Sequence, residues 1–147
     1  MKNSEILSKL PYQEPFLFVD EILEVDEIHI VGTYTFPSDS WFYSGHFKDK
    51  PVTPGVLLTE CMAQIGLVCL GIFINECTEV VTTSVAFTSS EVEFFLPVFP
   101  NEKVTVKSVK KYFRFQKLKC EVQMNNQEGE MVCKGTLAGM FRNETSQ

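Results

Sequence analysis

The sequence has few basic residues and lacks closely spaced cysteines. Thirteen Lys and Arg stand against 19 Asp and Glu, a net charge of −6, whereas nucleic-acid binding needs a positive surface that neutralises phosphates. The five cysteines are odd in number, and no two stand close enough for a zinc knuckle or a redox pair. The first ten residues contain no apolar run long enough for a signal peptide. We therefore expect a cytoplasmic protein with reduced thiols that binds no nucleic acid and no metal.

The chain does have enough apolar material for a core. Hydrophobic residues make up 44% of the 147 positions and aromatic residues 12%, including 13 Phe. This much apolar surface offsets the entropy of folding, so the composition excludes a disordered chain. The length suits one compact domain of ordinary size, and we expect a single domain over residues 1–147.

One stretch raises the question of a membrane span. The 19 residues from Val56 to Ile74 contain a single charged residue, Glu60, and that length nearly crosses a bilayer. The stretch also contains Thr59, Gln64 and two glycines, and no basic cluster flanks it. A lone carboxylate inside a span is also costly. We therefore expect no membrane contact, but a helix buried on nearly all sides of a soluble protein.

Hydrophobic periodicity predicts one long helix and several strands. The expected elements are a short helix over 4–10, strands over 16–19, 28–36, 80–87, 91–95, 104–109, 118–124 and 131–141, and a long helix over about 56–73. Residues 37–54, rich in Pro, should form an ordered loop, and 125–129 a hairpin turn. Short connections make the strands antiparallel. The sequence thus predicts an α+β fold in which a curved antiparallel sheet wraps around one long central helix.

The residues that carry chemistry lie between positions 44 and 64. His46 stands in the loop before the long helix, and a histidine titrates near neutrality and can act as a general base. Glu60 stands in the second turn of an apolar helix, where lost hydration should raise its pKa and keep it protonated. Gly55 stands at the expected helix N-terminus, where unpaired N–H groups could polarise a carbonyl. A neutral His and a protonated Glu are suited to acid–base chemistry.

Each of these residues also has a purely structural interpretation. A lone histidine in a loop commonly faces solvent, and a buried glutamate can be the partner of a lysine. A glycine that follows a proline before a helix is commonly a turn residue. The three signals are weak separately and suggestive together, because they fall within 15 residues.

The same segment resembles a known family signature. It reads Gly45-His46-Phe47, then Lys50-Pro51-Val52-Thr53-Pro54-Gly55-Val56, then Glu60-Cys61-Met62-Ala63-Gln64. This pattern resembles the signature of the FabZ-type β-hydroxyacyl-acyl carrier protein dehydratases of the hotdog-fold superfamily. Residues 10–20 resemble the opening motif of that family, and residues 91–102 resemble its Phe…Pro-Val-x-Pro-Gly-Asp stretch.

The resemblance implies a hotdog fold and a (3R)-3-hydroxyacyl-acyl carrier protein dehydratase, a lyase without a cofactor. It implies that His46 removes the α-proton and that Glu60 protonates the departing β-hydroxyl. The backbone N–H of Gly55 would bind the thioester carbonyl, and the backbone carbonyl of Val52 would orient His46. The two catalytic side chains of each site would come from opposite subunits of a homodimer, which in this family often assembles into a trimer of dimers.

The departures from the family pattern concern the substrate more than the catalytic pair. Lys48 stands where the family usually has Pro, Tyr12-Gln13 replaces His-Arg, and Asn101-Glu102 replaces Gly-Asp. Glu60 stands where the isomerising FabA-type relatives have Asp, which favours dehydration without movement of the double bond. The acyl chain length stays open, and so does the choice between fatty-acid synthesis and a specialised polyene-type pathway.

Basic residues are concentrated between positions 103 and 119. This stretch contains no Asp or Glu and seven cations, namely Lys103, Lys107, Lys110, Lys111, Arg114, Lys117 and Lys119. One interpretation is a solvated strand face, and the other is a docking surface for an acidic partner. The carrier protein implied by the resemblance is acidic. We therefore predict that Lys107, Lys111 and Lys117 contact it while its phosphopantetheine arm delivers the acyl chain.

Two other functions remain open at this point. A hotdog thioesterase would use a carboxylate and water and would not depend on His46. A non-catalytic acyl-binding subunit would need neither side chain, and the presence of both His46 and Glu60 counts against it.

Overall fold

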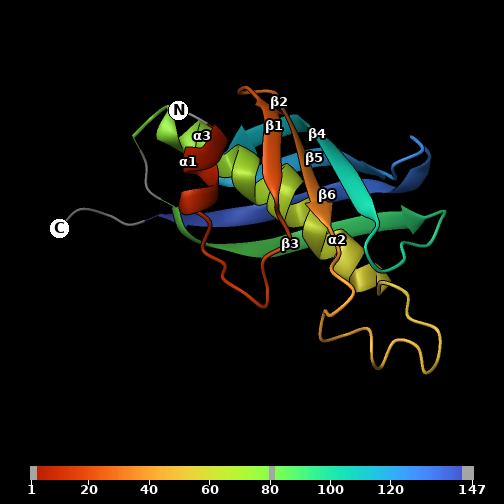
Figure 1. Ribbon diagram of the computed structural model, residues 1–147. Coiled ribbons are helices and arrows are strands. Elements are labelled where there is room, and N and C mark those ends of the chain that lie inside the picture. The colour runs from red at the N-terminus through yellow and green to blue at the C-terminus, as the bar shows by residue number, and fades with distance from the viewer. Residues whose placement is uncertain (1–2, 80–81, 144–147) are drawn as a thin grey trace.

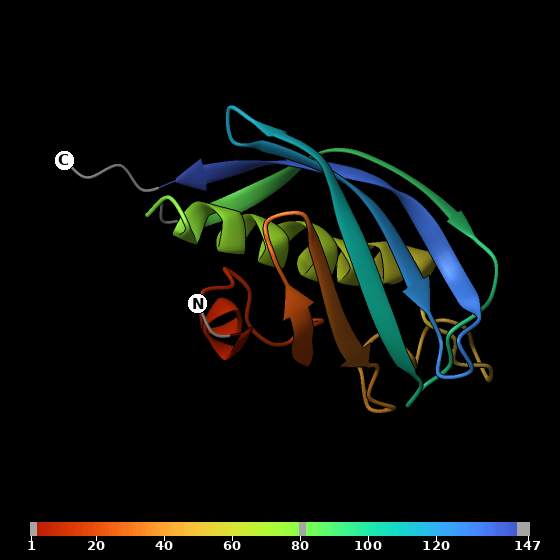
Figure 2. The same ribbon diagram turned by 90° about the horizontal axis from the view of Figure 1, so that it is seen from above.

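The computed structural model describes residues 3–79 and 82–143. A short helix, α1 (Asn3–Ser8), precedes six antiparallel strands that form one sheet in the order β1-β2-β4-β5-β6-β3. The strands are β1 (Glu21–Val25), β2 (His29–Thr35), β3 (Thr82–Phe94), β4 (Lys103–Arg114), β5 (Lys117–Asn125) and β6 (Met131–Asn143). The sheet curves around one long helix (Figures 1 and 2). The predicted α+β arrangement with a wrapped central helix is confirmed.

The central helix runs from Gly55 to Glu76 in three consecutive segments. These are α2 (Gly55–Ala63), a six-residue π-helical segment η1 (Gln64–Cys69) and α3 (Leu70–Glu76). Gly66 lets β4 and β5 approach closely, because an added Cβ there would lie 2.9 Å from Val122 Cγ1. The Ser108 hydroxyl donates a hydrogen bond of 2.8 Å to the carbonyl of Gly66. The helix is long and apolar enough to cross a membrane, but 78% of its most apolar window is buried in the fold, and this burial accounts for its composition.

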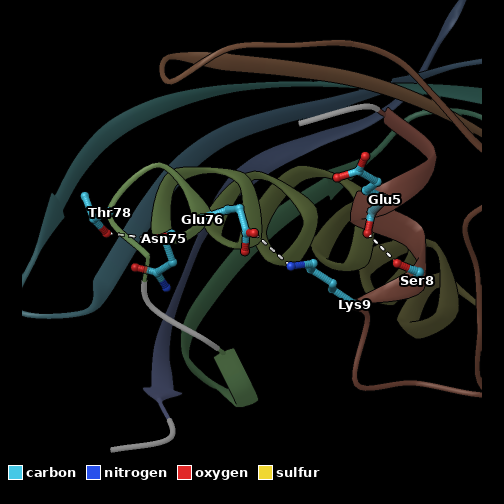
Figure 3. Close-up of polar contacts among 6 residues, drawn as sticks. All are labelled: Glu5, Ser8, Lys9, Asn75, Glu76 and Thr78. Atoms are coloured by element: carbon cyan, nitrogen blue, oxygen red, sulfur yellow. Dashed lines mark hydrogen bonds and ion pairs between the residues drawn. The ribbon is translucent and has the colours of Figure 1, made fainter. Parts of the chain in front are cut away.

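The segment before β1 is held by the helix and not by strand pairing. The prediction of a strand over residues 16–19 is wrong, because the backbone N–H of Phe18 bonds to the Gln64 side chain at 2.8 Å instead of to another strand. Phe18 and Val19 are nevertheless buried, so their apolarity reflects packing under the helix. Lys9, just after α1, forms an ion pair of 2.9 Å with Glu76 at the end of α3 (Figure 3).

Two further differences concern strand boundaries. The strand β1 was not predicted, because it is a short edge strand in which only Ile22 is buried, and it therefore carries little hydrophobic signal. The strands predicted over 80–87 and 91–95 are one strand, β3, with register shifts near its start and beside Phe87; residues 80–81 lie outside the described part. The other predicted strands and the turn at 125–129, where Gly129 has a φ of 79°, are confirmed.

Four of the five cysteines are buried, and Cys77 is exposed. Burial raises the pKa of the Cys120 thiol to about 11 and that of the Cys133 thiol to about 12. Burial likewise raises the pKa of the Cys61 and Cys69 thiols. The thiolate is the reactive form of cysteine, so these four side chains behave as small apolar core residues.

Candidate active site

His46 lies in the loop between β2 and the central helix and is fixed by a backbone pair. The N–H of Val52 donates to the carbonyl of His46 at 2.9 Å, and the ring Nδ1 of His46 lies 2.8 Å from the carbonyl oxygen of Val52. A carbonyl oxygen only accepts hydrogen bonds, so Nδ1 carries the proton in the neutral ring. Nε2 is then left with a free lone pair, the form that a general base requires.

Buried contacts anchor both sides of this loop. The hydroxyls of Tyr43 and Thr53, both buried, are 2.6 Å apart. The N–H of Thr53 also donates to the carbonyl of Val98 at 2.9 Å. The His46 ring, which is half-buried, stacks on Phe47 with 4.0 Å between ring centroids. The loop therefore holds the His46 ring in one position although it lacks secondary structure.

Gly55 is the first residue of the central helix. The first N–H groups of a helix have no acceptor within the helix, so the N–H of Gly55 is available at the positive end of the helix dipole. An added Cβ at this position would lie 3.3 Å from the ring of Phe94 on β3. A small residue is thus favoured where the backbone must stay accessible.

Glu60 lies one and a half turns into the helix, beside Gln64. Burial raises the pKa of Glu60, and a hydrogen bond from Gln64 partly opposes this shift. Nε2 of Gln64 donates to Glu60 Oε2 at 3.1 Å and to the carbonyl of Phe16 at 3.2 Å, while Oε1 accepts from the N–H of Phe18. Since Oε1 faces an N–H donor, the amide orientation is determined by its partners. The Oε2 atom of Glu60 therefore accepts a hydrogen bond from Gln64, and the Oε1 atom of Glu60 is left to carry the proton.

Glu60 lies on the wall of a mostly apolar cavity of about 210 Å³. It is the only carboxylate among the lining residues, and the phenol of Tyr12 is the only other titratable group there. Its lining residues come from the N-terminal segment, the central helix and β3; they are Tyr12, Phe16, Glu60, Ala63, Leu67, Val68, Val85 and Phe87. Burial, followed by the nearby charge of Glu60, raises the pKa of Tyr12 to about 12. The cavity offers an acyl chain an apolar wall next to a proton donor.

The structure places the predicted residues in two groups. His46, Val52 and Gly55 belong to the loop and the helix start, whereas Glu60 lies on the cavity wall. Within the described part of the chain, no hydrogen bond or ion pair joins His46 to Glu60. Gln64 and Tyr43 support the site and were missed as contributors, although Gln64 is a polar residue in an apolar helix, which is a sequence signal in itself.

The predicted docking lysines have different surroundings. Lys107 on β4 lines a groove on the outer face of the sheet together with Glu91, Glu93 and Glu121. Lys111 forms an ion pair of 3.2 Å with Glu121. Lys117 begins β5, directly after the β4–β5 turn. Acidic neighbours thus partly neutralise the positive charge of Lys107 and Lys111 on β4. No acidic neighbour is recorded for Lys117 among the described contacts.

Comparison with known proteins decides the family. The family model of the FabA-like domain matches residues 10–138. The chain belongs to the FabA-like family. A 3-hydroxyacyl-[acyl-carrier-protein] dehydratase FabZ of Bartonella quintana is 35% identical over 144 residues, which covers 93% of this chain and 87% of that protein. A FabZ of Sinorhizobium fredii is 33% identical, with the same coverage of both chains.

Solved structures agree on the fold of this FabA-like chain. The dehydratase heterocomplex ApeI:P of Xenorhabdus doucetiae has a TM-score of 0.81 at 15% identity and covers 95% of this chain and 91% of that one. A hypothetical thioesterase of Streptococcus pneumoniae, solved with coenzyme A, has a TM-score of 0.63 at 19% identity, covering 86% and 88%. The predicted hotdog fold is confirmed.

Proposed function

We propose that this chain is a (3R)-3-hydroxyacyl-[acyl carrier protein] dehydratase that acts in the cytoplasm, in fatty-acid or polyene-type synthesis. The observation that carries the proposal is that, in a member of this family, the His46 side chain is set to accept a proton and the Glu60 side chain is set to donate one. The Val52 carbonyl holds the proton of His46 on Nδ1, so that Nε2 is free to accept one. Burial raises the pKa of Glu60 beside an apolar cavity, so that its carboxyl can give one.

The reaction then needs three groups. Nε2 of His46 takes the proton from the α-carbon, and the electron pair of the broken C–H bond forms the new double bond. The bond between the β-carbon and its hydroxyl breaks, and the proton on Glu60 converts the leaving hydroxide into water. The N–H of Gly55 donates to the thioester oxygen while negative charge develops on it. Each acid–base group contributes about 10²–10⁴-fold and the oxyanion donor about 10²–10³-fold.

The proposal includes a homodimer in which His46 of one copy meets Glu60 of the other. In the described part of the chain, β3 pairs only with β6, so one side of a 13-residue strand has unpaired backbone groups. Such an edge favours pairing with another strand. Val56 supports an additional contact, because it is 77% exposed at the start of an otherwise buried helix. Assembly into a trimer of dimers is the larger state we propose.

An acyl carrier protein is the proposed source of the substrate. The basic stretch that contains Lys107, Lys111 and Lys117 would receive its acidic surface. Reversing these three charges should weaken turnover of carrier-bound substrate and spare short thioester mimics. Equal loss on both substrates would contradict a docking role.

A product assay tests the reaction itself. The protein is incubated with a 3-hydroxyacyl thioester, and we expect the trans-2-enoyl thioester with no free thiol. His46→Ala should lower the rate by about 10²–10⁴-fold, because the general base is lost. Free thiol without enoyl product would indicate a thioesterase, and neither product would indicate an acyl-binding subunit. Full dehydratase activity of His46→Ala would refute the mechanism.

A mixing experiment tests the shared site. Neither His46→Ala nor Glu60→Gln should be active alone. If both are unfolded and refolded together at equal amounts, half of the dimers contain one copy of each variant, and one of their two sites has both side chains intact. The mixture should therefore regain about a quarter of the wild-type activity in a twofold dimer. No recovery from folded mixed dimers would mean that both residues act within one chain.

A further inference from the structure

The phenol of Tyr12 is a polar group on the wall of an apolar cavity. Eight residues line the cavity beside Glu60, and only Glu60 and Tyr12 among them have polar side chains. Within residues 3–79 and 82–143, the Tyr12 hydroxyl takes part in no hydrogen bond. Polar groups held in a half-buried apolar setting are normally paired. Packing within the chain explains the ring of Tyr12 but not its hydroxyl.

The segment that carries Tyr12 is attached to the central helix on both sides of this residue. The Tyr12 ring packs on the ring of Phe16, with 6.3 Å between their centroids. The carbonyl of Phe16 accepts a hydrogen bond from Gln64, and the same amide nitrogen donates to Glu60. On the other side of Tyr12, Lys9 forms its ion pair with the end of α3 (Figure 3). Tyr12 and Glu60 are therefore held in a fixed relation on the wall of one cavity.

Tyr12 is a hydrogen-bond donor at neutral pH and not a base. Burial and the charge of Glu60 raise the pKa of Tyr12 to about 12. The phenol therefore keeps its proton near pH 7, and a protonated phenol donates one hydrogen bond. Because the charge of Glu60 contributes to this shift, the two polar groups lie near each other in the cavity. A ligand that meets the Glu60 carboxyl thus also comes within the surroundings of the Tyr12 hydroxyl.

The proposed reaction brings one oxygen atom to this place. The thioester oxygen of the substrate is assigned to the N–H of Gly55, and an acyl tail suits the apolar part of the wall. The β-hydroxyl is the polar group that must reach Glu60. Its oxygen has two lone pairs, and the proton of Glu60 uses one of them. While the bond to the β-carbon breaks, negative charge grows on this oxygen, so a second donor stabilises the transition state more than the ground state.

We propose that the Tyr12 hydroxyl donates a hydrogen bond to the β-oxygen of the substrate, which makes Tyr12 a further catalytic residue. The electron pair of the broken carbon–oxygen bond moves to the oxygen, Glu60 supplies the proton that completes the water molecule, and Tyr12 keeps its own proton throughout. In the reverse direction, the same two groups orient the water that attacks the β-carbon. This role rests on the proposed dehydratase function. In the proposed dimer, Tyr12 and Glu60 come from one copy and His46 from the other.

Tyr12→Phe tests this role, because it keeps the ring and removes only the hydroxyl. With a free (3R)-3-hydroxyacyl thioester as substrate, kcat/KM should fall about tenfold or more, and mainly through kcat. The saturated acyl thioester of the same length has no β-oxygen and serves as a competitive inhibitor. Its inhibition constant should be the same in Tyr12→Phe and in the wild type.

Two further measurements separate the chemical role from a structural one. Tyr112→Phe removes a phenol hydroxyl on β4, outside the cavity, and should leave both kcat/KM and the inhibition constant unchanged. The melting temperature of Tyr12→Phe should equal or exceed that of the wild type, because the hydroxyl has no partner within the described chain to lose. A lower melting temperature would show that the hydroxyl supports the fold, and would overturn the proposed role.

The outcomes also distinguish this role from the proposed function. A wild-type protein that forms no enoyl product from the free thioester would refute the dehydratase, and the role of Tyr12 with it. Equal kcat/KM values for the wild type and Tyr12→Phe would refute the role of Tyr12 and leave the dehydratase standing. If Tyr12→Phe lost as much affinity for the saturated thioester as it lost in kcat/KM, the phenol would shape the cavity without acting on the β-oxygen, contrary to the proposal.

Discussion

Gln64→Leu tests the link between the candidate acid and the N-terminal segment. The Gln64 side chain is fully buried and makes three hydrogen bonds, to Glu60 and to the backbone of Phe16 and Phe18. Leucine fills a similar volume and makes none of them. The change therefore removes polar partners without creating a large cavity.

The expected loss follows from the groups left without partners. The N–H of Phe18 stays buried and unpaired, and such a group costs about 1–3 kcal/mol. The carbonyl of Phe16 is less affected, because the Phe16 side chain is 41% exposed and water can reach this residue. We expect a total of about 2–4 kcal/mol, which for a chain of this length lowers the melting temperature by roughly 4–16 °C.

Urea denaturation and thermal melting measure this loss directly, with two companion variants. Gln123→Leu makes the same change at a half-buried position on β5 and should cost about 0.5 kcal/mol or less. Gln64→Glu keeps an acceptor for Phe18 but places a second carboxyl beside Glu60, so its deficit should grow as the pH rises. If Gln64→Leu were as stable as Gln123→Leu, the reasoning about this buried amide would be refuted.

Three other changes have defined outcomes. Glu60→Gln should stabilise the fold increasingly as the pH rises above the ordinary pKa of a glutamate, about 4.5, because burial raises the folded-state pKa of Glu60 and wild-type stability is lost as pH rises through it; equal melting temperatures at all pH values would contradict this. Gly135→Ala should cost about 1–3 kcal/mol in urea denaturation, because its Cβ would collide with the backbone oxygen of Glu91 on β3, whereas Gly45→Ala should be neutral because nothing lies near its added Cβ. Tyr43→Phe should cost about 1 kcal/mol by losing the Thr53 contact and lower kcat more than it changes KM; an unchanged kcat would mean that the loop does not need this anchor.

Much of the fold was predictable because its signals are local. The strand β5 alternates polar and buried apolar residues over its whole length, and the central helix is apolar on nearly every face. The wrong predictions concern segments in which a residue is buried without being in a strand, or is in a strand without being buried. Phe18 is buried without being in a strand, and β1 is a strand with one buried residue. Periodicity reports burial, and it cannot say which backbone groups pair.

The candidate site was predictable residue by residue but not as an arrangement. His46 and Glu60 stand out as a histidine beside glycine and a lone carboxylate in an apolar helix. The Gln64 amide bonds to the backbone of Phe18, and the Asn75 side chain bonds to Gln116 in the β4–β5 turn. These contacts span 41 or more positions of sequence, which no local pattern encodes. The acidic neighbours of Lys107 come from other strands for the same reason.

The distribution of thiols gives this protein a built-in attachment point. Cys77 is exposed directly after α3, two residues from the Asn75 that clamps the β4–β5 turn, while the other four cysteines are buried. A maleimide fluorophore or spin label added to the unmodified chain should therefore react at one position. Because Asn75 bonds to Gln116 in that turn, the label marks the end of the molecule where α3 meets the β4–β5 turn, without any cysteine being introduced or removed.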